Sequence, residues 1–304
     1  MPNPATVLAA AAACLVLVGG CGTAPRTSGA AAAAPPPSPT RSSVPPSVPP
    51  SGPSSSPPSS TAPPSFDPVA AGPWHVVALG DSVTAGARCG CTPFPVLYAR
   101  ALSRARGARV TVQNLGQGGQ DSAGLLAQLR QPGSLQRTAV RRADIVLLTI
   151  GANDFGNHHD DVVTDRCALD GAASCVRGEM AELRRNMAAL LATIRALRGS
   201  RPTAVLVTGY WNVFEDGAVA RRAWSAAGLR ASRRLTFLAD AVLHDAAVRA
   251  HATFVGLYAP FHGPAARGDV THLLARDGNH PDAAGQALIA QRLLAAGLRG
   301  LVAG

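Results

Sequence analysis

The chain has 304 residues and a formal net charge of +10, and all 28 of its basic residues are arginine. A basic protein attracts nucleic acid, anionic lipid or acidic polymers, but these arginines are scattered through amphipathic stretches typical of solvated helix faces. Aromatic residues make up only 4% of the chain, and no zinc-finger, basic-region or RNA-binding aromatic motif occurs. We therefore expect no nucleic-acid partner.

An apolar segment near the start of the sequence predicts export. Residues 7–18 are almost all apolar, a length that suits the core of a signal peptide and is too short for a membrane span. Gly19-Gly20-Cys21 follows and resembles a bacterial lipobox, although residues 1–6 carry no basic side chain. The resemblance implies a signal peptide over residues 1–20 and a lipid anchor on Cys21, outside the cytoplasm. A secretory signal cut elsewhere is the alternative.

The next segment, residues 21–73, consists mainly of alanine, proline, serine and threonine. Such a composition buries too little apolar surface to offset the entropy of ordering, so it predicts an extended, disordered linker. No second change of composition follows, and residues 74–304 suffice for one folded domain. We expect this domain to act as a monomer.

Four cysteines lie in the predicted domain: Cys89, Cys91, Cys167 and Cys175. An even number in an exported domain favours disulfides, and three pairings are open. A bond between Cys167 and Cys175 closes a short loop comfortably, whereas one between Cys89 and Cys91 closes a tight, strained ring. No C-x-x-C pair occurs, and the His158-His159 doublet is more typical of a solvated loop than of a metal site.

Apolar runs alternate with helix-period stretches along the domain. The runs cover residues 75–79, 110–115, 145–150, 204–208 and 253–257. The helix-period stretches cover residues 93–106, 125–142, 178–197, 219–250 and 283–298. The alternation predicts a three-layer α/β sandwich with a five-stranded parallel sheet, covered on both faces. In such a fold, ligands bind beyond the carboxyl ends of the strands.

A candidate nucleophile follows the first apolar run. Ser82 ends Gly80-Asp81-Ser82 at a point where residues 83–86 could begin a helix. A hydroxyl there lies near the positive end of a helix dipole, which favours the negative charge that develops during attack, although serine is also a common N-cap. The G-x-S-x-G nucleophile elbow does not fit, because Thr84 stands two positions after Ser82, and this disfavours an ordinary α/β-hydrolase.

A candidate base lies near the end of the chain. Asp277 precedes His280 by three positions, close enough in a loop for the carboxylate to meet the imidazole and hold one tautomer. Pro281 suits the first position of the terminal helix, with Asp282 in its first turn. Taken alone, residues 277–280 are more typical of a surface turn than of a catalytic loop.

Other polar residues near the predicted strand ends have less specific patterns. Ser122 opens a helical stretch but has no base motif, so we expect an N-cap. Asp81 and Asp154 are expected to support turns. Three residues after the fourth apolar run either line a substrate cleft or anchor their loop: Trp211, Asn212 and Phe214.

Four short blocks follow one another in the predicted domain: Gly80-Asp81-Ser82-Val83-Thr84-Ala85-Gly86, Gly116-Gln117-Gly118-Gly119, Gly151-Ala152-Asn153-Asp154 and Asp277-Gly278-Asn279-His280. In this order, each after an apolar run or before the last helix, the blocks resemble those of the SGNH, or GDSL, hydrolases. The resemblance spans nearly the whole domain. It implies a flavodoxin-like sheet and ester hydrolysis that needs no metal or organic cofactor.

The resemblance also implies a role for each site residue. Ser82 is implied as the nucleophile, His280 as the general base and Asp277 as the acid that orients the base. The implied oxyanion-hole donors are the backbone amides of Ser82 and Gly119 and the side-chain amide of Asn153, with Gly118 as the alternative to Gly119. Asn153 also follows the most strand-like run, residues 145–150, although an Asn-Asp turn is common there.

We therefore expect an exported carboxylic ester hydrolase that forms an acyl-enzyme on Ser82. Its substrate is a small-molecule, lipid or acylated-saccharide ester, and fold does not choose among these. A carbohydrate O-deacetylase and a cell-envelope acyltransferase are alternatives that use the same residues. A non-catalytic surface lipoprotein or binding module is an alternative of another class, and it would lack the four blocks.

Overall fold

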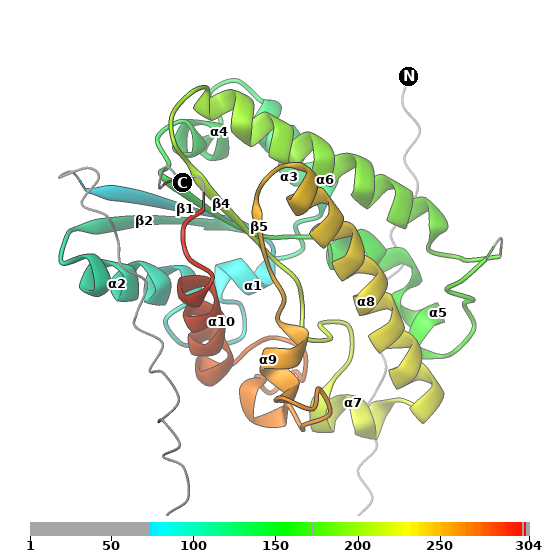
Figure 1. Ribbon diagram of the computed structural model, residues 1–304. Helices are drawn as coiled ribbons and strands as arrows, with labels where there is room; N and C mark the ends of the chain where they lie inside the picture. Colours follow the sequence, from blue (N-terminus) through cyan, green and yellow to red (C-terminus); the bar gives the residue numbers. More distant parts are fainter. Residues whose placement is uncertain (1–72, 172, 300, 302–304) are drawn as a thin grey trace, which may run out of the picture. The chain divides into compact units, whose positions relative to one another are not determined.

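The computed structural model describes residues 73–171, 173–299 and 301. The predicted signal peptide, the anchor at Cys21 and the linker up to residue 72 lie outside the described residues. A parallel five-stranded sheet runs through the described domain in the order β2-β1-β3-β4-β5 (Figure 1). Its strands are β1 (Trp74–Gly80), β2 (Val110–Gly116), β3 (Ile145–Thr149), β4 (Ala204–Thr208) and β5 (Thr253–Val255). All five predicted strands are confirmed.

Helices cover both faces of this sheet. The helices on one face are α2 (Phe94–Arg106) and α10 (Ala283–Ala295), which pack against each other (Figure 1). The helices on the other face are α3 (Ser122–Arg130), α4 (Leu135–Val140), α6 (Arg177–Arg198) and α8 (Ala226–Arg249). Every residue of β3 is buried between the layers. The chain thus has the predicted three-layer α/β sandwich. None of the described helices is both long and apolar enough to cross a bilayer.

Two stretches that we expected to be single helices are each broken. The stretch 125–142 falls into α3 and α4, because Pro132 lacks a backbone donor and Gly133 takes the left-handed conformation with φ +77° between them. The stretch 219–250 falls into α7 (Gly217–Ala223) and α8, because the Ser225 hydroxyl accepts the amide of Gly228 at 3.1 Å and starts a new helix.

Several short elements complete the fold and lie mainly where the chain leaves a strand. They are α1 (Ser82–Ala85), η1 (Asn153–His158), α5 (His159–Val163), α9 (Tyr258–His262) and η2 (Thr271–Leu273), of which η denotes a 3₁₀ helix. The close fit of β1 against β3 requires a glycine just before α1. Gly80 has φ +137°, and a Cβ there would collide with the carbonyl oxygen of Thr149.

Two disulfides close loops of the domain. Cys89 is bonded to Cys91 in the connection between α1 and α2, and Cys167 is bonded to Cys175 in the connection between α5 and α6. This is one of the three pairings that the sequence left open. The Cα atoms of the two pairs lie 5.1 Å and 5.7 Å apart, distances that a disulfide spans readily.

Candidate active site

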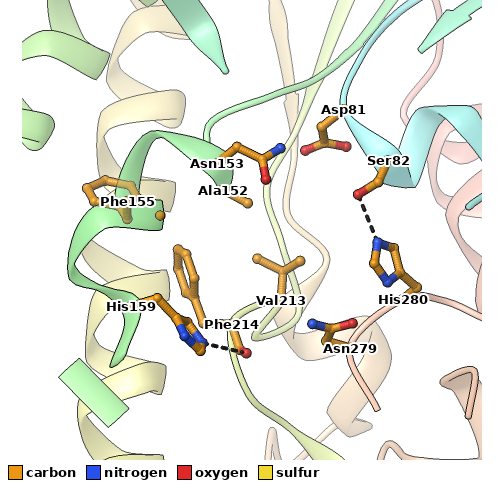
Figure 2. A pocket seen from close by; sticks show the side chains of 11 residues that line it. Asp81, Ser82, Ala152, Asn153, Phe155, His159, Val213, Phe214, Asn279 and His280 are labelled. Carbon is orange, nitrogen blue, oxygen red and sulfur yellow. Dashed lines mark hydrogen bonds between the residues drawn. The ribbon is translucent and has the colours of Figure 1, made fainter. Parts of the chain in front are cut away.

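The site lies where the strand order reverses. In a sheet of order 2-1-3-4-5, the crevice between the carboxyl ends of the first and third strands is the usual ligand-binding position. Ser82 follows β1 through a single residue, and Asn153 opens η1 after β3. His280 reaches the same place from the loop before α10, and Figure 2 shows the three side chains around one cavity.

The position of Ser82 is set by α1, a single turn held from three sides. Asp81 caps this turn, because its Oδ1 atom accepts the amide of Val83 at 2.9 Å. Asn114 of β2 donates from Nδ2 to a carbonyl of the turn at 2.7 Å. Gln286 of α10 donates from Nε2 to the carbonyl of Val83 at 3.3 Å. The serine is therefore fixed relative to both a strand and the terminal helix.

His280 lies in a small hairpin. Leu274 pairs with Pro281 in an antiparallel bridge, and the amide of Ala275 donates to the carbonyl of His280 at 2.7 Å. The helix α10 starts at Ala283 and is capped by Asp282, which accepts two amides at 2.8 and 2.9 Å. Our prediction that Pro281 opens the helix was therefore wrong, because the bridge draws this residue into the hairpin.

Three of the predicted site residues form one hydrogen-bonded chain. The Nε2 atom of His280 lies 2.9 Å from Ser82 Oγ, and Nδ1 lies 2.7 Å from Asp277 Oδ2. The other oxygen of Asp277 accepts the backbone amides of His280 at 3.1 Å and Asn279 at 3.3 Å. An ionised Asp277 accepts the proton on Nδ1, so Nε2 carries the lone pair that faces the serine hydroxyl.

The charge state of Asp277 follows from its partners. Burial works to raise the pKa of this carboxyl, but hydrogen bonds from the amide and ring of His280 and the amide of Asn279 outweigh burial and lower the pKa below its usual value. Arg88 stands 3.9 Å from Oδ2 and its side chain is 74% exposed, so solvent screens most of its influence. Asp277 is therefore ionised at neutral pH.

A cavity of about 330 Å³ opens in front of Ser82. Its lining residues are Asp81, Ser82, Ala152, Asn153, Phe155, Gly156, His159, Val213, Phe214, Asn279 and His280. In Figure 2, Phe155 and His159 lie across the cavity from Ser82 and His280. The rings of Phe155 and Phe214 meet edge to face at 5.8 Å. Ser82 thus faces a partly apolar wall.

Asn153 and the glycine loop lie against each other. Asn153 lines the cavity, and its Nδ2 atom donates to the carbonyl of Gln120 at 2.8 Å. Gly119, which precedes Gln120, has φ +75°, a conformation that favours glycine. Gly118 does not have a positive φ. Among the described residues, neither Gly118 nor Gly119 lines the cavity. Asn153 and Ser82 therefore line the same cavity, whereas the glycine loop contacts Asn153 through Gln120.

Asp81 is a second carboxyl close to the serine, and unlike Asp277 it is buried. It is 1% exposed, and burial raises its pKa to about 6 against the opposing hydrogen bonds from Tyr210 and the amide of Val83. We expected a turn residue, and Asp81 does cap α1, but its Oδ2 atom also accepts the hydroxyl of Tyr210 at 2.5 Å. No pattern in the sequence indicated Tyr210, whose only sign is its place after a strand.

Ser122, the rival serine, is buried away from an imidazole. Its hydroxyl contacts Asp154 and accepts the side-chain amide of Asn186 at 2.9 Å, and its described hydrogen bonds include no histidine. The N-cap of α3 is Asp121, which accepts the amide of Gly124 at 2.8 Å. Our prediction of an N-cap at Ser122 was wrong by one residue. Asp154 therefore bonds to Ser122 of α3, whereas we expected it to support its own turn.

The residues of the loop after β4 have both of the roles that we considered, loop anchoring and lining of a cleft. Trp211 is fully buried and stacks on Phe261 with ring centroids 4.7 Å apart. The side chain of Asn212 is bonded to two hydroxyls of α8 at 2.8 and 2.9 Å. These two residues anchor the loop, whereas Phe214 lines the cavity.

The histidine doublet is not a solvated loop, contrary to our expectation. His158 pairs with Glu179 at 2.5 Å, and His159 lies 3.4 Å from Glu215 and lines the cavity. The hydrogen bond to Glu215 raises the pKa of His159 to about 9, although burial opposes the shift. Each imidazole has a carboxylate partner. The described residues contain no cluster of three or more side chains suited to hold a metal ion.

Comparisons with known proteins place this chain in a family. Residues 78–288 match the GDSL-like Lipase/Acylhydrolase family. A comparison with curated protein sequences found no match. One similar solved structure is the lipase Lip_vut3 from a goat rumen metagenome, which is 21% identical with a TM-score of 0.56 over 75% of this chain and 100% of that one. A second is a variant of Axe2, an acetyl xylan esterase from Geobacillus stearothermophilus, which is 19% identical with a TM-score of 0.52 over 73% of this chain and 94% of that one. A third is phospholipase A1 from Streptomyces albidoflavus NA297, which is 22% identical with a TM-score of 0.51 over 74% of this chain and 99% of that one.

At these identities the solved structures show the shared fold, while the family match covers more than half of the chain. The chain belongs to the GDSL-like lipase/acylhydrolase family, the SGNH hydrolases, and is a serine ester hydrolase.

Proposed function

We propose that Ser82, His280 and Asp277 act as a catalytic triad that hydrolyses carboxylic esters through an acyl-enzyme. One observation carries the proposal: the unbroken chain of contacts from Asp277 Oδ2 to His280 Nδ1 at 2.7 Å and from His280 Nε2 to Ser82 Oγ at 2.9 Å. Nucleophile, base and orienting acid all lie within hydrogen-bonding distance, as acyl transfer requires.

In the first half of the reaction, Ser82 Oγ forms a bond to the ester carbonyl carbon while His280 Nε2 takes the hydroxyl proton. Asp277 stays ionised and stabilises the imidazolium that forms. The tetrahedral intermediate then collapses, and the bond to the alcohol oxygen breaks. The imidazolium returns its proton to that oxygen, so a neutral alcohol leaves and the acyl group remains on Ser82.

The tetrahedral oxyanion needs donors that do not titrate. We assign the side-chain amide of Asn153 and the backbone amide of Ser82 to this hole, since amide donors stabilise charge as it develops. The family resemblance of residues 116–119 adds the backbone amide of Gly119, although this residue does not line the cavity in the free protein. Asn153 and Ser82 line the same cavity. Asn153 Nδ2 donates to the carbonyl of Gln120 in the free protein, so its second N–H is the one available to substrate.

In the second half, a water molecule attacks the acyl carbon and His280 Nε2 takes one of its protons. Collapse of this second intermediate breaks the bond to Ser82 Oγ, which recovers its proton from the imidazolium. The products are a carboxylic acid and the regenerated serine. The apolar wall formed by Phe155, Val213 and Phe214 favours an acyl group with a hydrocarbon body.

The test is hydrolysis of a chain-length series of chromogenic acyl esters by the wild type, Ser82→Ala and Ser122→Ala. We expect Ser82→Ala to lose turnover at every length and Ser122→Ala to retain it, since the second serine is buried against a carboxylate and an amide. Hydrolysis by Ser82→Ala at the wild-type rate would refute the triad. Product analysis with an added acceptor alcohol separates hydrolysis from acyl transfer.

We also propose that the protein is exported and anchored through a lipid on Cys21. The apolar residues 7–18 and the following Gly19-Gly20-Cys21 support export and lipidation. The two disulfides of the domain suit an oxidising compartment outside the cytoplasm. Mass spectrometry of the membrane-extracted protein should find a diacylated N-terminal Cys21, and an unmodified N-terminus beyond that residue would refute the anchor.

A further inference from the structure

The hydroxyl of Tyr210 joins the two loops that carry the proposed catalytic groups. Tyr210 is fully buried just after β4, donates to Asp81 Oδ2 at 2.5 Å and accepts the amide of Ala152 at 3.3 Å. Asp81 directly precedes Ser82, and Ala152 directly precedes Asn153. We propose that Tyr210 is a positioning residue that sets the distance between the nucleophile and the oxyanion donor. This inference rests on the proposed function.

The directions of the two hydrogen bonds are determined by chemistry. A backbone amide only donates, so the hydroxyl oxygen of Tyr210 must accept from Ala152. The single hydroxyl proton then points to Asp81, whose other oxygen already accepts the amide of Val83 at 2.9 Å. The Tyr210 hydroxyl thus uses both its proton and its oxygen, and phenylalanine at this position would leave the amide of Ala152 and Oδ2 of Asp81 without this partner.

Tyr210 is itself held rigidly. Its backbone amide donates to Asp240 Oδ1 of α8 at 3.0 Å. The preceding residue is Gly209, where a Cβ would come within 2.6 Å of the Asp240 carboxylate. The following residue, Trp211, is stacked on Phe261. The tyrosine is thus a fixed point, provided by β4 and α8, against which the other two loops are placed.

A bridge is needed at this point because the backbone pairing of β1 and β3 stops just before it. The last bond between their exits is the amide of Asp81 donating to the carbonyl of Thr149 at 3.0 Å. Beyond it, Ser82 turns into α1 and Asn153 turns into η1. A shift of about 1 Å in a reacting group can cost about a hundredfold in rate, so a link between these exits matters for turnover.

The experiment compares Tyr210→Phe with a matched control, Thr208→Val. The hydroxyls of Thr208 and Thr149 lie 2.7 Å apart, and both residues are fully buried at the same edge of the sheet. Thr208→Val therefore removes one buried hydrogen bond without touching either loop. The measurements are kcat and KM on the best chromogenic ester, the thermal midpoint, and the affinity for a boronic acid that adds to the serine as a tetrahedral anion.

For Tyr210→Phe we expect kcat to fall about ten- to a hundredfold with KM changed less than about twofold, because only the transition-state geometry is impaired. Boronic acid affinity should fall with kcat. Thr208→Val should lower the thermal midpoint to a similar extent and keep kcat within about twofold of the wild type. Asp81→Ala removes the acceptor at the other end of the bridge, together with the cap of α1, and should also lower kcat, which provides the test should Tyr210→Phe not fold.

The inference is overturned if Tyr210→Phe keeps the wild-type kcat, if Thr208→Val loses as much kcat as Tyr210→Phe, or if Tyr210→Phe does not fold and Asp81→Ala keeps the wild-type kcat. Ser82→Ala separates this failure from that of the triad. Activity lost in Ser82→Ala but retained in Tyr210→Phe refutes only the positioning role. Activity retained in Ser82→Ala refutes the proposed function itself.

Discussion

His280 Nε2 and Ser82 Oγ lie 2.9 Å apart although 198 positions separate the two residues along the chain. The contact depends on α10, which begins two residues after the His280 hairpin ends and packs along α2. Gln286 of α10 also bonds to α1 and α2, so the helix that follows the histidine directly holds the turn that carries the serine.

Gln286 should therefore be important for stability. Its Oε1 atom accepts the amide of Phe94 at 2.7 Å and its Nε2 atom donates to the carbonyl of Val83, all in the buried interior. Gln286→Leu leaves the buried amide of Phe94 without this acceptor, whereas the carbonyl of Val83 keeps the amide of Gly86 at 3.2 Å, and we expect a loss of about 1–3 kcal/mol in the free energy of unfolding. Urea denaturation measures the loss, with Gln113→Leu at an exposed position of β2 as the control. Equal stability of the two variants would contradict this role.

Asn153→Ala should lower turnover about a hundred- to a thousandfold, the usual loss when an oxyanion-hole donor is removed. The matched control is Asn157→Ala, an exposed residue of the same 3₁₀ helix, which should retain activity. Steady-state kinetics with a short acyl ester give both values. Full activity of Asn153→Ala would remove this residue from the oxyanion hole.

Asp277→Asn should reduce turnover by about 10⁴-fold, as the corresponding change does in serine proteases, because an amide no longer holds the imidazole in the productive tautomer. Asp282→Asn provides the control. Asp282 is the N-cap of α10, and asparagine caps as well as aspartate, so this variant should keep both stability and kcat. If the two variants had equal kcat values, Asp277 would have no special role.

Asp240 should make the stability of the protein depend on pH. Burial raises the pKa of this carboxyl to about 7, although the hydrogen bond from Tyr210 opposes the shift. Because its folded pKa lies above its unfolded value, ionisation as the pH rises through about 7 destabilises the folded state, and stability is regained toward lower pH. Asp240→Asn should thus be more stable than the wild type at pH 8 and lose this advantage by about pH 4. A stability difference that does not change with pH would contradict the shift.

Much of the fold could be predicted, because strands and helices depend on local pattern. The apolar runs at residues 145–150 and 204–208 are recognisable without any knowledge of their neighbours, and their parallel pairing follows from the helices between them. The breaks in the predicted helices were missed although Pro132-Gly133 and Ser225 mark them, since the apolar period continues across both.

The residues that support the site could not be predicted in this way. Tyr210 contacts Asp81 across 129 positions, and Gln286 contacts Phe94 across 192 positions. Neither contact leaves a spacing or a composition that a sequence pattern could show. Ser82, Asn153 and His280, in contrast, belong to short motifs at strand or helix ends, and the structure places all three around one cavity.

The covalent intermediate offers the most direct measurement. The enzyme is mixed with a chromogenic ester, quenched in acid within the first turnovers, digested and mapped by mass spectrometry, alongside a sample treated with a fluorophosphonate. We predict that the acyl group and the phosphonyl group are both found on Ser82, and that Ser82→Ala carries neither. Labelling of Ser122 or another residue, or steady hydrolysis with Ser82 never modified, would contradict the assignment of Ser82 as the nucleophile.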